Sequence, residues 1–150
     1  MSAERNPQVE LSFGSDIAYL DLVEGTTNEI ARLTGFNDED LFWIALAVRE
    51  AVANAIRHGN QGNPAIPVKV VYRWEPNHLK IEVYDKGRGI DESKIPDPLA
   101  PENLLKPEGR GIFFVRSFMD KVRFKVLPEG GHVVIMEKSV RKEQRGHHEN

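Results

Sequence analysis

The chain has 150 residues, 40% hydrophobic and 29% charged, and its 20 Lys and Arg against 23 Asp and Glu give a formal net charge of -3. A chain of this length buries roughly 68–70% of its unfolded surface, enough for one hydrophobic core that needs no disulfide bond or structural metal ion. It contains no cysteine, which excludes disulfides. The balanced charge and a pI near 6.0 argue against a basic face that coats phosphates, so we do not expect nucleic acid as a partner.

Neither a membrane span nor export is expected. The longest unbroken apolar run, residues 41–48, is far shorter than the ~20 residues that cross a bilayer. Residues 1–8 are polar and lack the cationic start and apolar stretch of a signal peptide. Because the chain has no cysteine, it suits a reducing compartment, and we expect it in the cytoplasm.

The first third of the chain predicts one strand and two helices. The apolar periodicity gives a strand at residues 9–13, a helix at residues 16–34 and a second helix with an apolar body at residues 41–56. Gly35 ends the first helix, and either Asn37 or Asp38 caps the second.

The rest of the chain predicts two hairpins separated by a long loop. The expected strands are residues 68–74, 79–84, 122–127 and 132–138. Residues 91–108 hold four of the nine prolines, which excludes a continuous helix or central strand and predicts a lid or binding loop. A short helix is expected at residues 109–118.

This order predicts an α+β fold. Because the strands cluster in adjacent hairpins, the sheet should be mixed but mostly antiparallel, with the helices on one face. No GxGxxG follows the first strand, which argues against a Rossmann domain. We expect one domain at residues 1–140 and a disordered charged tail at residues 141–150.

Three polar residues interrupt the apolar second helix at four-residue spacing: Glu50, Asn54 and His58. Residues four apart are neighbours on a helix surface, about 6 Å apart along its axis, so the three side chains form one stripe. A solvated polar stripe has the same spacing, and spacing alone does not separate it from a site.

The second motif is Asp85-Lys86-Gly87-Arg88-Gly89-Ile90, directly after a predicted strand. The two-residue alternation of a strand turns Asp85 toward the apolar face of residues 79–84, where a carboxylate needs a hydrogen-bond donor. That donor is either a backbone amide in an Asx turn or a ligand amine such as that of adenine. Gly87 and Gly89 suit both a turn and a ligand passing close to the backbone.

The third motif is Gly109-Arg110-Gly111-Ile112, after the predicted lid and at the start of a short helix. Free amides at a helix N-terminus attract phosphate oxygens, and glycines allow their close approach. The same glycines also fit a simple hinge of the lid.

Together, ExxxNxxxHG on a helix, DxGxGI after a strand and GxGI at a helix start, in this order, resemble the N box and the two glycine boxes of the GHKL ATPase superfamily. The resemblance covers about residues 38–138. The short form, with one strand and one helix before residues 49–55, is similar to anti-sigma factor serine/threonine kinases of the RsbW/SpoIIAB type. It implies a two-layer α/β sandwich.

The resemblance implies that the chain binds ATP and Mg²⁺. Glu50 would be the general base, Asn54 would hold Mg²⁺, and Asp85 would bind adenine. The implied nucleotide-binding residues are Asn54, His58, Asp85, Gly87, Gly89, Ile90, Gly109, Arg110, Gly111 and Ile112.

The resemblance also implies a function and partners. A kinase of this type would phosphorylate an anti-sigma factor antagonist with a STAS domain, bind a sigma factor and form a homodimer. The alternative is an ATP-gated binding module without kinase activity. The sequence departs from the family pattern at two places. Lys106 and Pro107 stand where some relatives have an arginine, and this departure concerns kinase activity. His132 stands near the place of a common threonine that supports the adenine-binding Asp, and this departure concerns the adenine contact.

Overall fold

The structure is a computed structural model, and it describes residues 6–87 and 115–141. The described strands form one five-stranded sheet in the order β1-β2-β3-β5-β4, and every neighbouring pair is antiparallel. The strands are β1 (Gln8–Gly14), β2 (Pro67–Glu75), β3 (His78–Asp85), β4 (Lys121–Val126) and β5 (His132–Ser139). Each lies within one residue of the strand that the sequence predicts.

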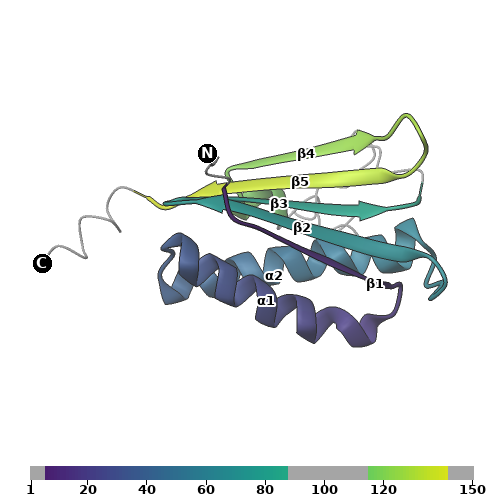
Figure 1. The fold of residues 1–150 in the computed structure, drawn as a ribbon, viewed down its shortest axis with the longest axis horizontal. Coiled ribbons are helices and arrows are strands. Elements are labelled where there is room, and N and C mark those ends of the chain that lie inside the picture. The colour runs from purple at the N-terminus through teal and green to yellow at the C-terminus, as the bar shows by residue number, and fades with distance from the viewer. Residues whose placement is uncertain (1–5, 88–114, 142–150) are drawn as a thin grey trace, which may run out of the picture.

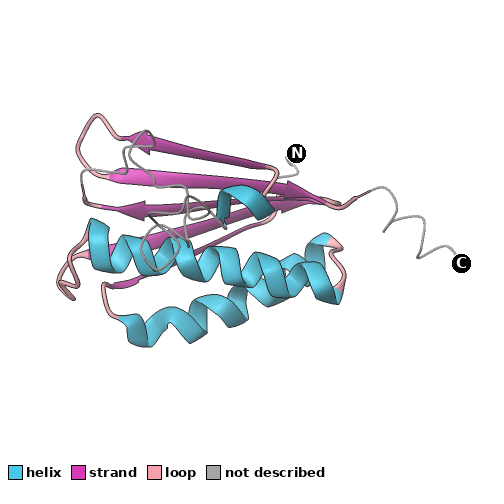
Figure 2. Ribbon diagram, turned by 180° about the vertical axis from the view of Figure 1, so that it is seen from behind, coloured by secondary structure: helices cyan, strands magenta, loops and turns pink. Residues whose placement is uncertain are grey.

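Two long helices cover one face of this sheet (Figure 1). They are α1 (Leu20–Thr34), which follows the short 3₁₀ helix η1 (Ile17–Tyr19), and α2 (Asp38–Asn54). Gly35 ends α1 in the left-handed conformation, with a φ of 115°, where glycine has no Cβ to clash. The side chain of Asn37 caps α2 by accepting from the backbone N–H of Asp40. Seen from behind, the two helices again lie together on that face (Figure 2), so the predicted α+β fold is confirmed.

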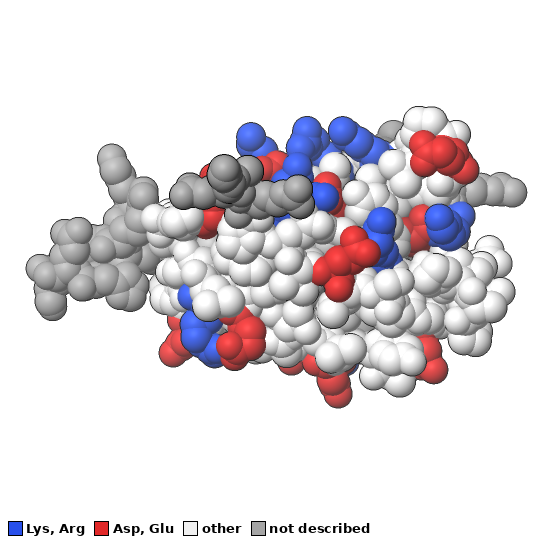
Figure 3. Space-filling model, viewed as in Figure 1, with Lys and Arg blue, Asp and Glu red and all other residues white. Residues whose placement is uncertain are grey.

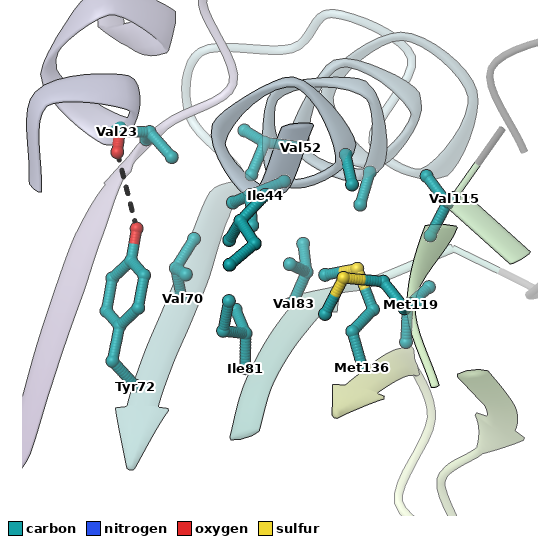
Figure 4. Packing of buried hydrophobic residues seen from close by; sticks show 14 of the residues in the cluster. Val23, Ile44, Val52, Val70, Tyr72, Ile81, Val83, Val115, Met119 and Met136 are labelled. Atoms are coloured by element: carbon teal, nitrogen blue, oxygen red, sulfur yellow. Dashed lines mark hydrogen bonds between the residues drawn. The ribbon is translucent and has the colours of Figure 1, made fainter. Parts of the chain in front are cut away.

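The core lies between the helices and the sheet. Ile44 and Val52 of α2 face the β-strand residues Val70, Ile81 and Val83, and all five are fully buried (Figure 4). Burial of each such side chain contributes about 1.5–3 kcal/mol. This packing fixes the distance of α2 from the sheet, and with it the position of any polar side chain along the edge of α2.

Tyr72 of β2 ties α1 to the sheet through its hydroxyl group. The hydroxyl lies 2.7 Å from Oγ1 of Thr27 and donates to the carbonyl of Val23 at 3.4 Å (Figure 4). Burial raises the pKa of Tyr72 to about 12, so the phenol remains neutral at physiological pH.

The edge strand β4 carries three exposed basic side chains: Lys121, Arg123 and Lys125. Figure 3 shows Lys and Arg side chains gathered along the upper rim of the molecule, the side on which β4 lies in Figure 1. One of them, Arg123, pairs with Glu137 on the neighbouring strand. Within the described residues, no helix has both the length and the apolar character needed to cross a bilayer.

Candidate functional site

Two of the predicted site residues lie on the edge of α2. Glu50 and Asn54 are one helical turn apart and half-buried, whereas residues 51–53 between them are buried. They form a polar edge on a helix that buries residues 44, 45, 47, 48 and 51–53 in the core. The preceding residue, Arg49, donates to Asp21 of α1 at 3.0 Å, and this hydrogen bond raises the pKa of Arg49.

After Asn54 the helix widens into one π-helical turn, η2 (Ala55–Gly59), which the sequence pattern did not predict. The backbone N–H of Asn60 donates across it to the carbonyl of Ala55, at 2.8 Å. His58 is exposed in this turn, whereas Gly59 packs against the end of β3. Single π turns inside α-helices often mark functional sites.

Asp85 is the last residue of β3, and only 6% of it is exposed. It lies at the end of the sheet where α2 also ends (Figure 1). Its Oδ1 accepts the backbone N–H of Gly87 at 2.7 Å, so the Asx-type donor that the sequence allowed is present. Its Oδ2 faces Nδ1 of His132 at 3.5 Å. One carboxylate oxygen is therefore held by the chain itself, and the other has no close amide donor within the described residues.

Gly59 packs directly against this carboxylate, and Gly87 packs against the backbone of Gly59. A Cβ added to Gly59 would lie 2.4 Å from Cγ of Asp85, and a Cβ added to Gly87 would lie 2.5 Å from the carbonyl oxygen of Gly59. Contacts this short mean that a side chain at either position would force neighbouring atoms to move. The glycines therefore bring the end of the helix and the end of the strand into backbone contact around the carboxylate.

Asn60 fastens the π turn to the sheet, although the sequence analysis did not identify it. It is 2% exposed, and its side-chain amide donates to Oγ of Ser15 at 2.9 Å and to the carbonyl of Pro67 at 3.1 Å. Its Oδ1 accepts the N–H of Lys86 at 2.8 Å. The only sequence signal was an Asn directly after the His-Gly pair, which ordinary turn chemistry also explains.

His132 is a second residue that lies at the site without a role assigned to it in the sequence analysis, where it appears only as a departure near the place of a common threonine. It begins β5, opposite Asp85 in the sheet register, and is 2% exposed. Its ring stacks on that of Phe124, at 6.2 Å between centroids. Gly131 precedes it with a φ of 98°, and a Cβ there would lie 2.8 Å from the carbonyl oxygen of Asp85.

Several predictions lie outside the described residues: Gly89, Ile90, Gly109, Arg110, Gly111, Ile112, the lid at residues 91–108 and the tail from residue 142 onward. Of the short helix predicted at residues 109–118, the described part, residues 115–118, is helical.

The described residues fit a nucleotide better than a metal held by protein alone. Across residues 6–87 and 115–141, no three His, Cys, Asp or Glu side chains are grouped so that they could hold a metal ion. Mg²⁺ bound with a nucleotide takes most of its ligands from phosphates and water, so the single amide oxygen of Asn54 fits it. The buried carboxylate of Asp85, which has one oxygen without a backbone amide donor within the described residues, fits a base that carries an amino group.

Comparisons with known proteins are consistent with this arrangement. A family model described as a histidine kinase-like ATPase domain matches residues 13–138. The serine-protein kinase RsbW of Oceanobacillus iheyensis is 25% identical over 142 residues, covering 91% of this chain and 89% of that protein. RsbW of Staphylococcus epidermidis is 28% identical over 143 residues, with coverage of 91% and 89%.

One solved structure is also similar, the crystal structure of the RsbU and RsbW domains of a Mycobacterium tuberculosis protein. It aligns with a TM-score of 0.56 at 16% sequence identity. The alignment covers 90% of this chain and 33% of that longer chain. This likeness supports the fold.

Proposed function

Because the chain belongs to the histidine kinase-like ATPase domain family, we propose that it is an ATP-dependent protein serine/threonine kinase of the anti-sigma factor type. Its substrate would be a serine or threonine of a STAS-type anti-sigma factor antagonist, and its second partner a sigma factor. As a cytoplasmic regulator it would release or retain the sigma factor according to the state of the antagonist. A homodimer is part of the same proposal.

The observation that carries this proposal is the environment of Asp85. One oxygen of its carboxylate is held by Gly87, and the backbone of Gly59 covers its flank without a side chain. The other oxygen, Oδ2, accepts no backbone amide within the described residues and lies 3.5 Å from Nδ1 of His132, and the exocyclic amino group of adenine would supply a further donor. Asp85 would thus select the base, while Gly59 and Gly87 hold the carboxylate in place by close packing.

The edge of α2 would carry the chemistry. The carboxylate of Glu50 would take the proton of the attacking hydroxyl as its oxygen bonds to the γ-phosphorus, while the bond from that phosphorus to the β-phosphate oxygen breaks and ADP leaves. Asn54, one turn further along, would bind Mg²⁺, which neutralises phosphate charge when bound. His58 would lie beside the phosphates or the ribose.

The glycine motifs beyond β3 belong to the proposal on sequence grounds alone. Gly89, Ile90 and the segment Gly109-Arg110-Gly111-Ile112 would contact the nucleotide, the latter through backbone amides and one guanidinium on the phosphates.

A second candidate is an ATP-gated module that holds its partner without phosphorylating it. Lys106 and Pro107 favour it, because the segment before the second glycine motif offers no arginine at that place. The two functions differ in one product, because only the kinase would yield a phosphorylated antagonist. Incubation with γ-labelled ATP, Mg²⁺ and a panel of STAS-domain proteins should transfer label to a serine or threonine of one antagonist. Nucleotide-dependent binding of an antagonist that stays unlabelled would instead establish the binding module.

A further inference from the structure

Asn60 is a buried polar residue between the two segments that meet at Asp85. It follows Gly59 at the end of the π turn, and its Oδ1 accepts the backbone N–H of Lys86, the residue after Asp85, at 2.8 Å. Gly59 itself packs against the carboxylate of Asp85. The side chain of Asn60 therefore joins the end of the helix to the end of β3, directly beside that carboxylate.

The hydrogen bonds of Asn60 fix the direction in which its side-chain amide faces. Its Nδ2 donates to Oγ of Ser15 at 2.9 Å and to the carbonyl of Pro67 at 3.1 Å, whereas an asparagine that only shapes a turn bonds to backbone two residues away. A reversed amide would set its oxygen against the Pro67 carbonyl and its NH₂ group against the N–H of Lys86. Because Asn60 is 2% exposed, water would not replace the lost bonds. The oxygen of the amide therefore stays on Lys86.

The backbone of Lys86 decides how the two oxygens of Asp85 are used. The next residue, Gly87, donates its backbone N–H to Oδ1 of Asp85 at 2.7 Å. The N–H groups of Lys86 and Gly87 belong to consecutive planar peptide units, so a movement of one displaces the other. While Asn60 holds the first N–H, the second holds Oδ1, and Oδ2 is the oxygen that the proposed function assigns to the base. Without the bond from Asn60, the turn and the carboxylate are free to rotate together.

We propose that Asn60 is a positioning residue for base recognition, because it holds the backbone of residues 86 and 87 so that Asp85 presents Oδ2 to the amino group of the base. This inference rests on the proposed ATP site. It adds a residue that acts on the base through Asp85 and not by a contact of its own. An acceptor that is already fixed loses less conformational freedom when the ligand binds, and the hydrogen bond to the base is stronger by that amount.

The test removes the amino group from the ligand and Asn60 from the protein, separately and together. Full-length wild type and Asn60→Ala are titrated calorimetrically, in Mg²⁺, with ATP and with an ATP analogue that has hydrogen in place of the exocyclic amino group. The matched control is Asn63→Ala, the same change three residues further along. Asn63 is exposed, and its Oδ1 accepts the nearby N–H of Ala65 at 3.0 Å. Thermal unfolding without nucleotide shows whether each protein is folded.

The expected result is a coupling between Asn60 and the amino group. Wild type should bind ATP about tenfold or more tightly than the analogue, because the analogue leaves a buried charged acceptor without its donor. In Asn60→Ala this ratio should fall to about threefold or less, while the affinity for the analogue stays within about threefold of wild type. Asn63→Ala should keep the wild-type ratio. A merely structural role of Asn60 would weaken both ligands alike and leave the ratio unchanged.

Ser15→Ala keeps the inference testable if Asn60→Ala does not fold. It removes one of the two acceptors of the Asn60 amide and leaves the acceptor of the Lys86 N–H in place, so the ratio should fall at least about twofold. An unchanged ratio in Asn60→Ala, or in Ser15→Ala where Asn60→Ala is unfolded, overturns the inference. If wild type binds no ATP, or binds both ligands equally, the proposed function itself fails, and either result is distinguishable because it needs no variant.

Discussion

The Glu50→Gln variant is expected to transfer phosphate to the antagonist at least about 10²-fold more slowly than wild type, because an amide cannot take the proton of the attacking hydroxyl. The substitution keeps the size of the side chain at a half-buried position one turn before Asn54. The affinity for Mg-ATP should stay within about threefold of wild type, because Glu50→Gln removes no proposed contact to the base.

The matched control for Glu50→Gln is Glu39→Gln, the same change on the same helix. Glu39 is exposed in the first turn of α2, where its charge only favours the helix N-terminus. Single-turnover assays with labelled ATP and the antagonist should give wild-type rates for Glu39→Gln. Equal rates for both variants would remove Glu50 from the proposed chemistry.

The Gly59→Ala variant is expected to lose at least about tenfold in ATP affinity, the loss that follows when a buried charged hydrogen-bond partner is displaced. Its new methyl group would lie 2.4 Å from Cγ and 2.6 Å from Oδ2 of Asp85. Because this carboxylate is buried and short, it cannot swing away as the end of a long side chain can. Overpacking of this kind should also lower stability by about 1–3 kcal/mol.

Gly25→Ala is the matched control for Gly59→Ala. Gly25 lies in the interior of α1, and an added Cβ there meets nothing within 4 Å. Alanine in a helix interior is favoured over glycine by about 0.5–1 kcal/mol, so this variant should be slightly more stable and bind ATP normally. Calorimetric titration and thermal unfolding measure both effects. Wild-type ATP affinity in Gly59→Ala would show that the contact with Asp85 does not shape the site.

The fold was largely predictable because each strand has a clear local signal. Apolar residues alternate along β2 and β3, and the turn between them uses Asn77 in a left-handed conformation with a φ of 69°. The pairing of β3 with β5, rather than with the next strand along the chain, is not a local property. It depends on how the whole sheet packs against α2, and a short window of sequence holds no information about that packing.

The site was predictable where a residue sits on a regular element and not where two elements meet. Asp85 could be placed on the buried face from strand alternation alone, and the structure confirms its burial. The role of Asn60 and the contact between His132 and Asp85 depend on segments far apart in sequence. Periodicity cannot detect such contacts, so the sequence did not show that His132 lies against Asp85.

Thermal unfolding of wild type and of Asp85→Asn, with and without Mg-ATP, tests the role of the buried carboxylate most directly. Asparagine keeps an oxygen for the N–H of Gly87 but puts an amide donor where the base needs an acceptor. At about 100 times its Kd, the nucleotide should stabilise wild type by about 2.7 kcal/mol, or roughly 5–10 °C, and Asp85→Asn far less. Equal shifts in the two proteins, or none in wild type, would contradict the account.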